Sequence, residues 1–288
     1  MLVTSIVKHD GALYAATIPN GKIFTNAGGW KLYATMPSKL AWQLAVHGGK
    51  LVAACGSPGA LYEVAAEPKK LWPVSDLKVE NVLSLAVEGD GLLLGTAAPG
   101  YLVRLAGGTS RILHDFGDGE VKAIVASKDV IHAAVNNGQK VPPSQFLQAV
   151  ETAEKKEGAA PAPPGPVSGA VWRISSERTE KALEFPSSYV TDLARREDGV
   201  FVGTNNSGRV FRLTAEGPEL AFDFPEGQVL AFVGEAKKLS CLMGNRAAVR
   251  SFGTERAARG AFVSDVLDAR FPSQWGTITR RGTGAFKV

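Results

Sequence analysis

The segments LLLGTAAPGYLVRL (Leu92–Leu105) and VFVGTNNSGRVFRL (Val200–Leu213) are two copies of one pattern. In each copy a short apolar strand ends at a small residue, turns through Gly, Asn or Pro, and continues into a second strand. The pattern occurs six times along the chain. Its equivalent positions are Thr17, Cys55, Thr96, Val135, Thr204 and Met243.

These equivalent positions lie 38, 41, 39, 69 and 39 residues apart, so the long fourth interval is one ordinary period plus an insertion. A period of about 40 residues with four β-type segments in each copy is typical of the blades of a β-propeller. The sequence therefore predicts an all-β fold with six recognisable four-stranded repeats, arranged as six or seven blades.

Within a copy, the first strand is expected to be innermost. The first strands of several copies are apolar on both faces, as expected where neighbouring sheets pack face to face around a channel. The fourth strands carry more charge, which places them at the rim. In the first copy we expect strands at Val3–Lys8, Ala12–Thr17, Lys22–Thr25 and Trp30–Ala34.

The repeats assign residues 1–266 to the propeller, with an insertion at 138–167 in the fourth copy. Within the insertion, a helix of about three turns is expected after Pro143, followed by a tether rich in Pro and Ala. Residues 267–288 hold two further possible strands. They are expected to be part of an extra blade or the start of a following domain, which would make the chain a fragment of a longer protein.

The composition excludes several classes of function. The chain has 288 residues, 45% hydrophobic content and a net charge of +4. Its Lys and Arg are scattered rather than gathered into a basic stripe, so we expect no binding to nucleic acid. No apolar run is long enough to span a membrane, and the N-terminus reads as a first strand rather than a signal peptide. Cys55 and Cys241 are expected to be free, buried thiols.

The run VTSIVKHDGALYAATIPNGKIF (Val3–Phe24) and the run EVKAIVASKDVIHAAVNN (Glu120–Asn137) resemble, with the two segments quoted first, a group of uncharacterised bacterial β-propeller repeat proteins. FVSDVLDARFPSQWGTIT (Phe262–Thr279) also resembles this group, in which a β-sandwich-like segment follows the propeller. The resemblance implies a propeller fold, an exported multi-domain protein and an extracytoplasmic setting. It brings no catalytic residue to this chain.

The two ends of each blade can be distinguished from the sequence. Because the first and second strands are antiparallel, the start of one and the end of the other lie at the same end of the blade. That end also carries the insertion, and propellers usually bind ligands at the mouth of their channel. The candidate ligand contacts at this end are Trp42, Glu120, Lys122, Asn136, Asp192 and Asn205.

Each candidate also has a structural interpretation. The Asn residues can serve as turn residues, since Asn tolerates left-handed backbone geometry. Trp42 can be a stacking platform or a plug between blades. Lys122 and Asp192 stand at the repeat positions of Thr4 and Ser5, where the other copies have neutral residues. Such a break in a repeat points to a site, although a solvated channel rim also tolerates charge.

The sequence favours a non-enzymatic scaffold that binds a protein or glycan partner through the insertion-bearing face, as a module of a larger bacterial protein. The alternative is a metal-dependent lactonase or hydrolase with Glu120, Asp192 and Asn205 in the channel. A third possibility is a structural spacer without a ligand. The four His residues show no ligand spacing, and there is no nucleophile elbow, phosphate loop or dinucleotide motif, so we expect no cofactor and no metal.

Overall fold

The computed structural model describes residues 1–73, 77–127, 129–138, 167–205, 207–235 and 238–252. These residues form 23 strands and no helix, which confirms the all-β prediction. The strands all belong to one compact unit, Met1–Gly253. A second unit, Thr254–Val288, lies outside the described residues, as do the predicted helix of the insertion and the predicted strands after residue 266.

Each repeat forms one antiparallel sheet whose strands follow one another in chain order. The first sheet contains β1 (Leu2–His9), β2 (Ala12–Ile18), β3 (Lys22–Thr25) and β4 (Lys31–Thr35). The second contains β5 (Leu40–His47), β6 (Lys50–Gly56), β7 (Ala60–Glu63) and β8 (Lys69–Pro73). The third contains β9 (Asn81–Glu88), β10 (Gly91–Ala97), β11 (Tyr101–Ala106) and β12 (Thr109–Asp115).

The remaining three sheets repeat this order. The fourth contains β13 (Glu120–Ala126), β14 (Val130–Asn137), β15 (Ser168–Ser175) and β16 (Thr179–Phe185). The fifth contains β17 (Val190–Arg196), β18 (Gly199–Thr204), β19 (Arg209–Thr214) and β20 (Gly217–Asp223). The sixth, as described, contains β21 (Gln228–Glu235), β22 (Lys238–Gly244) and β23 (Ala248–Phe252).

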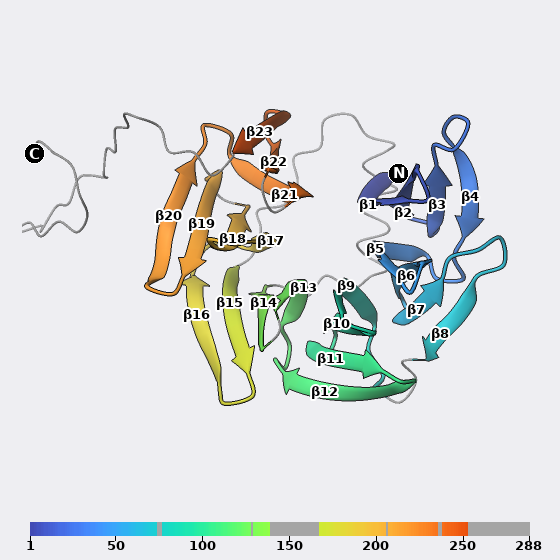
Figure 1. Cartoon of the computed structure of the whole chain (residues 1–288), viewed down its shortest axis with the longest axis horizontal. Coiled ribbons are helices and arrows are strands. Elements are labelled where there is room, and N and C mark those ends of the chain that lie inside the picture. Colours follow the sequence, from blue (N-terminus) through green and yellow to red (C-terminus); the bar gives the residue numbers. More distant parts are fainter. Residues whose placement is uncertain (74–76, 128, 139–166, 206, 236–237, 253–288) are drawn as a thin grey trace, which may run out of the picture. The chain divides into compact units, whose positions relative to one another are not determined.

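Figure 1 shows the six sheets as blades around a common axis, with the first strand of each blade toward the axis and the fourth strand of the first five blades toward the rim. The inner strands β1, β5, β9, β13, β17 and β21 contact one another in succession. One backbone pair, Gly56 with Asn81, also joins the second and third sheets. The predicted strands of the first copy are confirmed to within one residue at each end.

The strand register confirms the period read from the sequence. The six positions that define the period are all buried, and each pairs with the first or second residue of its inner strand. The six pairs are Val3 with Thr17, Ala41 with Cys55, Val82 with Thr96, Val121 with Val135, Val190 with Thr204, and Val229 with Met243.

The hydrophobic core is divided among the blade interfaces. Five apolar clusters fill the five spaces between successive sheets. At the first interface, for example, Ile23 of β3 packs in a cluster with Leu44 and Leu51 of the second blade. Because blades two to five bury apolar side chains on both of their faces, their inner strands lack the alternation of polar and apolar residues seen in a half-exposed sheet.

Polar side chains also tie neighbouring inner strands together. The Ser5 hydroxyl accepts the N–H of Leu44 at 3.1 Å, and the Ser84 hydroxyl donates to the carbonyl of Val121 at 2.8 Å. The side-chain amide of Gln43 makes two such bonds, since it donates to the carbonyl of Leu85 and accepts the N–H of the same residue. Ser5, Gln43 and Ser84 occupy one position of the repeat, so each of the first three blades is tied to the next from the same position.

The two cysteines agree with the sequence prediction. Cys55 and Cys241 are free thiols and both are buried. Burial raises the pKa of each thiol to about 12, so both are protonated and inert at neutral pH.

Replacing Ser84 by Ala should lower the free energy of unfolding by about 1–2 kcal/mol, because the carbonyl of Val121 then loses its buried donor. Urea unfolding followed by circular dichroism measures this loss. The matched control is Ser110→Ala on the exposed outer strand β12, which should change stability little. Equal effects of the two substitutions would contradict the role of Ser84 as a tie between blades.

Candidate functional site

Each inner strand contains one residue that has no partner on the second strand. In all six blades the pairing of the inner strand with the second strand shifts by one residue. The shift comes directly after the pair that defines the period in that blade, such as Val3 with Thr17 in the first blade. Such a bulge bends the strand and redirects the side chain of the extra residue. The extra residues are Thr4, Trp42, Leu83, Lys122, Thr191 and Leu230.

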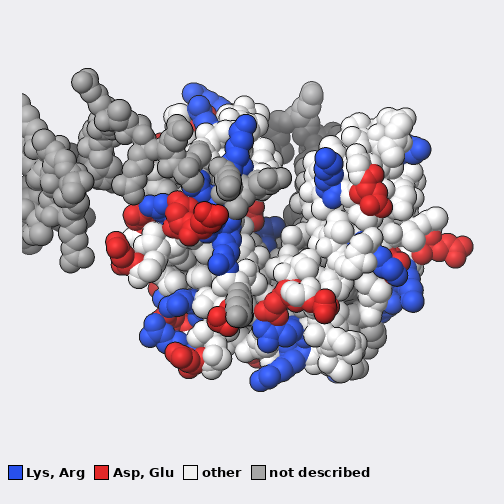
Figure 2. Space-filling view, in the orientation of Figure 1, with Lys and Arg blue, Asp and Glu red and all other residues white. Residues whose placement is uncertain are grey.

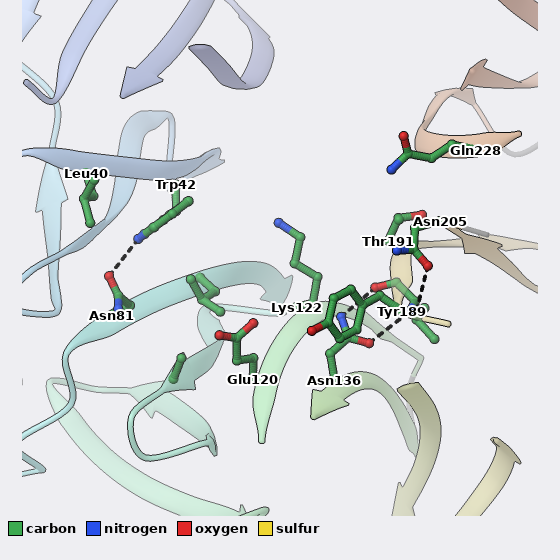
Figure 3. A pocket seen from close by; sticks show the side chains of 13 residues that line it. Leu40, Trp42, Asn81, Glu120, Lys122, Asn136, Tyr189, Thr191, Asn205 and Gln228 are labelled. Carbon is green, nitrogen blue, oxygen red and sulfur yellow. Dashed lines mark hydrogen bonds between the residues drawn. The ribbon is translucent and has the colours of Figure 1, made fainter. Parts of the chain in front are cut away.

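Four of these six bulge residues line one cavity of about 380 Å³ (Figure 3). The cavity lies where inner strands begin and second strands end, because its walls include the first residues of β9, β13 and β21 and the last residue of β10. Blades two to six all contribute to it. The lining residues are Leu40, Trp42, Asn81, Leu83, Ala97, Glu120, Lys122, Asn136, Tyr189, Val190, Thr191, Asn205 and Gln228.

Lys122 is the charged bulge residue of the set, and its side chain extends into the space between the two walls of the cavity (Figure 3). Among the described residues, its ammonium group has no hydrogen bond and no ion pair, and the side chain is exposed. Glu120 lies two residues earlier on the same strand. Loss of hydration raises the pKa of the Glu120 carboxyl, and the positive charge of Lys122 partly offsets this.

The polar residues on the walls differ in how many of their side-chain groups are already hydrogen-bonded within the protein. Asn136 is committed to structure, because its amide donates to the carbonyl of Val190 at 2.8 Å and accepts the N–H of the same residue at 2.9 Å. Asn205 accepts the N–H of Tyr189 through its amide oxygen. Its amide nitrogen has no hydrogen bond among the described residues. The indole N–H of Trp42 donates to Asn81 at 2.9 Å, which holds the ring on the cavity wall.

Three further groups on the wall were not singled out from the sequence. The hydroxyl of Thr191 is buried and has no hydrogen-bond partner among the described residues. The amide of Gln228 likewise has no partner among them, and Tyr189 has a raised pKa because of burial and the nearby charge of Glu120. Thr191 could have been found, since it stands at the same repeat position as Trp42 and Lys122. Gln228 could also have been found, since it stands at the repeat position of Glu120, whereas Tyr189 precedes the first residue of its strand and carries no comparable signal.

Asp192 lies next to the cavity but is not part of its lining. It occupies the position of Ser5 and Ser84 and ties blades together in the same way, since one carboxylate oxygen accepts the N–H of Phe232 at 2.8 Å. The other oxygen accepts the N–H of Leu193 at 2.8 Å. Burial raises the pKa of Asp192 to about 6, although both hydrogen bonds and the charge of Lys122 act to lower it.

Five of the six residues proposed from the sequence therefore meet in one cavity, and Asp192 stands beside it with both oxygens engaged. That these residues bind a ligand stays a prediction. Within the described part of the chain, no group of three or more His, Cys, Asp or Glu side chains is placed to hold a metal ion. The described residues include no helix long and apolar enough to cross a membrane.

A second hollow, of about 460 Å³, lies between the third and fourth blades. Among its charged lining residues, Arg104 is already engaged by Glu88 through two hydrogen bonds of 2.6 and 2.8 Å. Only two blades line it, whereas five blades line the cavity around Lys122. The cavity around Lys122 is therefore the better candidate for a binding site.

No protein-family model and no curated protein matches this sequence. Among solved structures, the chain is similar to the extracellular domain of the putative one component system BT4673 from B. thetaiotaomicron, with a TM-score of 0.62 and 11% identity. That match covers 86% of this chain but only 32% of the other, so the chain spans about a third of the length of that structure.

Two further structures are similar over most of both chains. The nidogen/laminin complex matches with a TM-score of 0.55 and 9% identity, covering 86% of this chain and 88% of the other. BamB from Moraxella catarrhalis matches with a TM-score of 0.50 and 13% identity, covering 90% and 85%. These neighbours are β-propellers, and at such low identity the likeness shows the fold alone. The chain is therefore a β-propeller.

The raised pKa of Asp192 predicts a pH dependence of stability. Because the folded protein holds the Asp192 proton more tightly than the unfolded chain does, protonation stabilises the fold. This contribution is fully present below the ordinary pKa of 3.8 and is lost as the pH rises through about 6. We expect the free energy of unfolding to decrease between pH 4 and pH 7, and to decrease less in Asp192→Asn. Urea titrations across this range measure it, and identical pH profiles for the two proteins would contradict it.

Proposed function

We propose that the chain is a non-enzymatic β-propeller module of a larger bacterial protein, and that it binds a protein or glycan partner through the insertion-bearing face. The observation that carries this proposal is the cavity into which the Lys122 ammonium extends without a partner among the described residues. The strands that flank the insertion, β14 and β15, belong to the same blade as Lys122, and Asn136 of β14 lines the cavity.

The two walls of the cavity differ in chemistry. On one side Leu40 and the ring of Trp42 offer apolar contact area (Figure 3). On the other side Thr191, Asn205 and Gln228 offer hydroxyl and amide groups (Figure 3). Binding sites typically combine an apolar wall, which supplies affinity, with a few polar groups that fix the orientation of the ligand. A sugar ring and a polar protein loop both have this mixed character.

The charges of the described surface favour a partner that is not strongly charged. On the face shown in Figure 2, acidic and basic side chains lie interspersed with neutral surface. Inside the cavity, the positive charge of Lys122 is accompanied by the carboxyl of Glu120. A neutral partner that accepts a hydrogen bond from Lys122 and donates one to Glu120 would satisfy both groups. The nidogen/laminin complex shows that one propeller of this fold was crystallised with a protein partner, which supports a binding role by analogy only.

Replacing Lys122 by Ala should weaken partner binding by about tenfold or more, because a charge-assisted hydrogen bond is lost. The side chain is exposed and unpaired among the described residues, so the fold should be unaffected. Binding is measured on a glycan array and by capture from a bacterial lysate, with thermal melting as a check on folding. The matched control is Lys8→Ala, an exposed Lys near the opposite end of its inner strand. Equal binding by the wild type and Lys122→Ala would contradict the proposal.

Deleting residues 138–167 should leave the propeller folded and abolish partner capture. The strands on either side, β14 and β15, pair in direct register at Asn137 and Ser168, so a short turn can replace the segment. The melting temperature and the same capture assay report the two effects separately. Unchanged capture by a folded deletion variant would exclude the insertion from the binding face.

A metal-dependent lactonase or hydrolase is the second candidate. It is favoured by Glu120 and Asn205, which line the same cavity and supply oxygen atoms of the kind that Ca²⁺ prefers. If this function is correct, Ca²⁺ should raise the melting temperature of the wild type, since an ion that binds only the folded state stabilises it. Glu120→Gln should remove the shift. A wild-type melting temperature that does not change with any divalent ion would exclude this candidate.

A further inference from the structure

Packing between blades uses the same positions of the repeat at every interface. One such position lies on the inner strands, where an apolar residue packs against the preceding blade and is at most 7% exposed. Its occupants in four successive blades are Leu44, Leu85, Ile124 and Leu193. In the first blade the same register position holds Ile6, which is 59% exposed.

A position on the second strands behaves in the same way. Its residues in blades two to six are at most 6% exposed, and they are Leu51, Leu92, Ile131, Val200 and Leu239. In the first blade the position holds Leu13, which is 36% exposed. The register also aligns Ile6 with Ala15, Phe24 and Leu32, so an apolar row crosses all four strands of this face. We call it the open face of the first blade.

In the sixth blade the exposed face is the one that, in the other blades, packs against the following blade. On the third strands, one position packs against the following blade, and its residue is completely buried in each of the first five blades. These residues are Ile23, Leu61, Leu102, Val171 and Val210. In the sixth blade the position holds Val249, which is 64% exposed. Val233 on the inner strand is also exposed, although its counterparts Val7 and Ala45 pack against the next blade. This is the open face of the sixth blade.

The two open faces do not cover each other. Among the described strands, successive inner strands contact one another from β1 to β21, but no strand of the sixth sheet packs along a strand of the first. Figure 1 shows the interval between these two sheets. Each open face presents the half of an interface that is formed five times elsewhere in the unit. Contiguous apolar surface of this kind is rarely left in water and marks a site of interaction.

We propose that one further blade of the same repeat packs between the open faces of the first and sixth blades, and that it is supplied by polypeptide of the same protein outside residues 1–288. A blade has one face of each kind, so a single additional sheet covers both surfaces through the interface already used at every other position. Residues 254–288 are fewer than the 38 to 41 residues of one ordinary period of the repeat.

This inference rests on the proposed function in one respect, namely that the chain is a module of a larger protein. It does not depend on the cavity around Lys122. The two proposals therefore fail separately, because one is tested by partner binding and the other by the accessibility of the open faces.

The test is thiol labelling of Ile6→Cys and Val249→Cys, each prepared both in residues 1–288 and in the full gene product. The native thiols of Cys55 and Cys241 are buried and protonated, so they give no background. The matched controls are Ile124→Cys and Val171→Cys, which carry the same substitutions at the same repeat positions inside formed interfaces. Thermal melting confirms that each variant is folded, and hydrogen exchange of β1 and β23 gives the same information without substitution.

We expect Ile6→Cys and Val249→Cys to react as fast as a free thiol in residues 1–288 and to be protected in the full gene product. The controls should be protected in both. Protection that is already complete in monomeric residues 1–288 would overturn the proposal, because the chain itself would then cover the faces. Protection that increases with protein concentration would assign them to a second copy and would also overturn it. Fast labelling in the full gene product, or a gene that encodes nothing beyond these residues, would do the same.

Discussion

The structure depends on two adjacent positions in each inner strand, an unpaired bulge residue and the residue that follows it. In four blades, the side chain of the second position bonds to the backbone of the next inner strand, through Ser5, Gln43, Ser84 and Asp192. The bulge turns its own side chain toward the channel, where four of the six bulge residues line one cavity. The same local irregularity thus sets the spacing of the blades and selects which side chains a ligand can meet.

This arrangement lets the lining of the cavity differ from blade to blade within one fold. The bulge residues have no paired residue on the second strand, and Trp42, Leu83, Lys122 and Thr191 differ in size, charge and polarity at equivalent positions. In four blades the adjacent position instead holds a backbone group of the neighbouring blade. The cavity lining is therefore concentrated at one position of the repeat, and the hydrogen bonds between blades at the next.

Much of the fold could be predicted from the sequence, because turn residues punctuate the strands at a regular period. The position of Thr17 and its five equivalents was correctly aligned, and so was the end of the blades at which Trp42 and Glu120 lie. The surroundings of Asp192 could not be predicted. A one-residue bulge before it changes which side of the strand the following side chains face, so counting alternate residues along the sequence gives the wrong side. The exposure of Ile6 also could not be predicted. An apolar residue at a repeat position is expected to be buried, and the sequence does not show whether a neighbouring blade is present to cover it.

The central claim is that a partner binds at the end of the blades where the bulges lie. Hydrogen exchange of the chain with and without a captured partner tests this most directly. The account predicts added protection of the backbone around Lys122 and Thr191, together with the first residues of β9 and β21. Protection confined to the turns at the other end of the inner strands, such as Gly48 and Gly49 after β5, would contradict it.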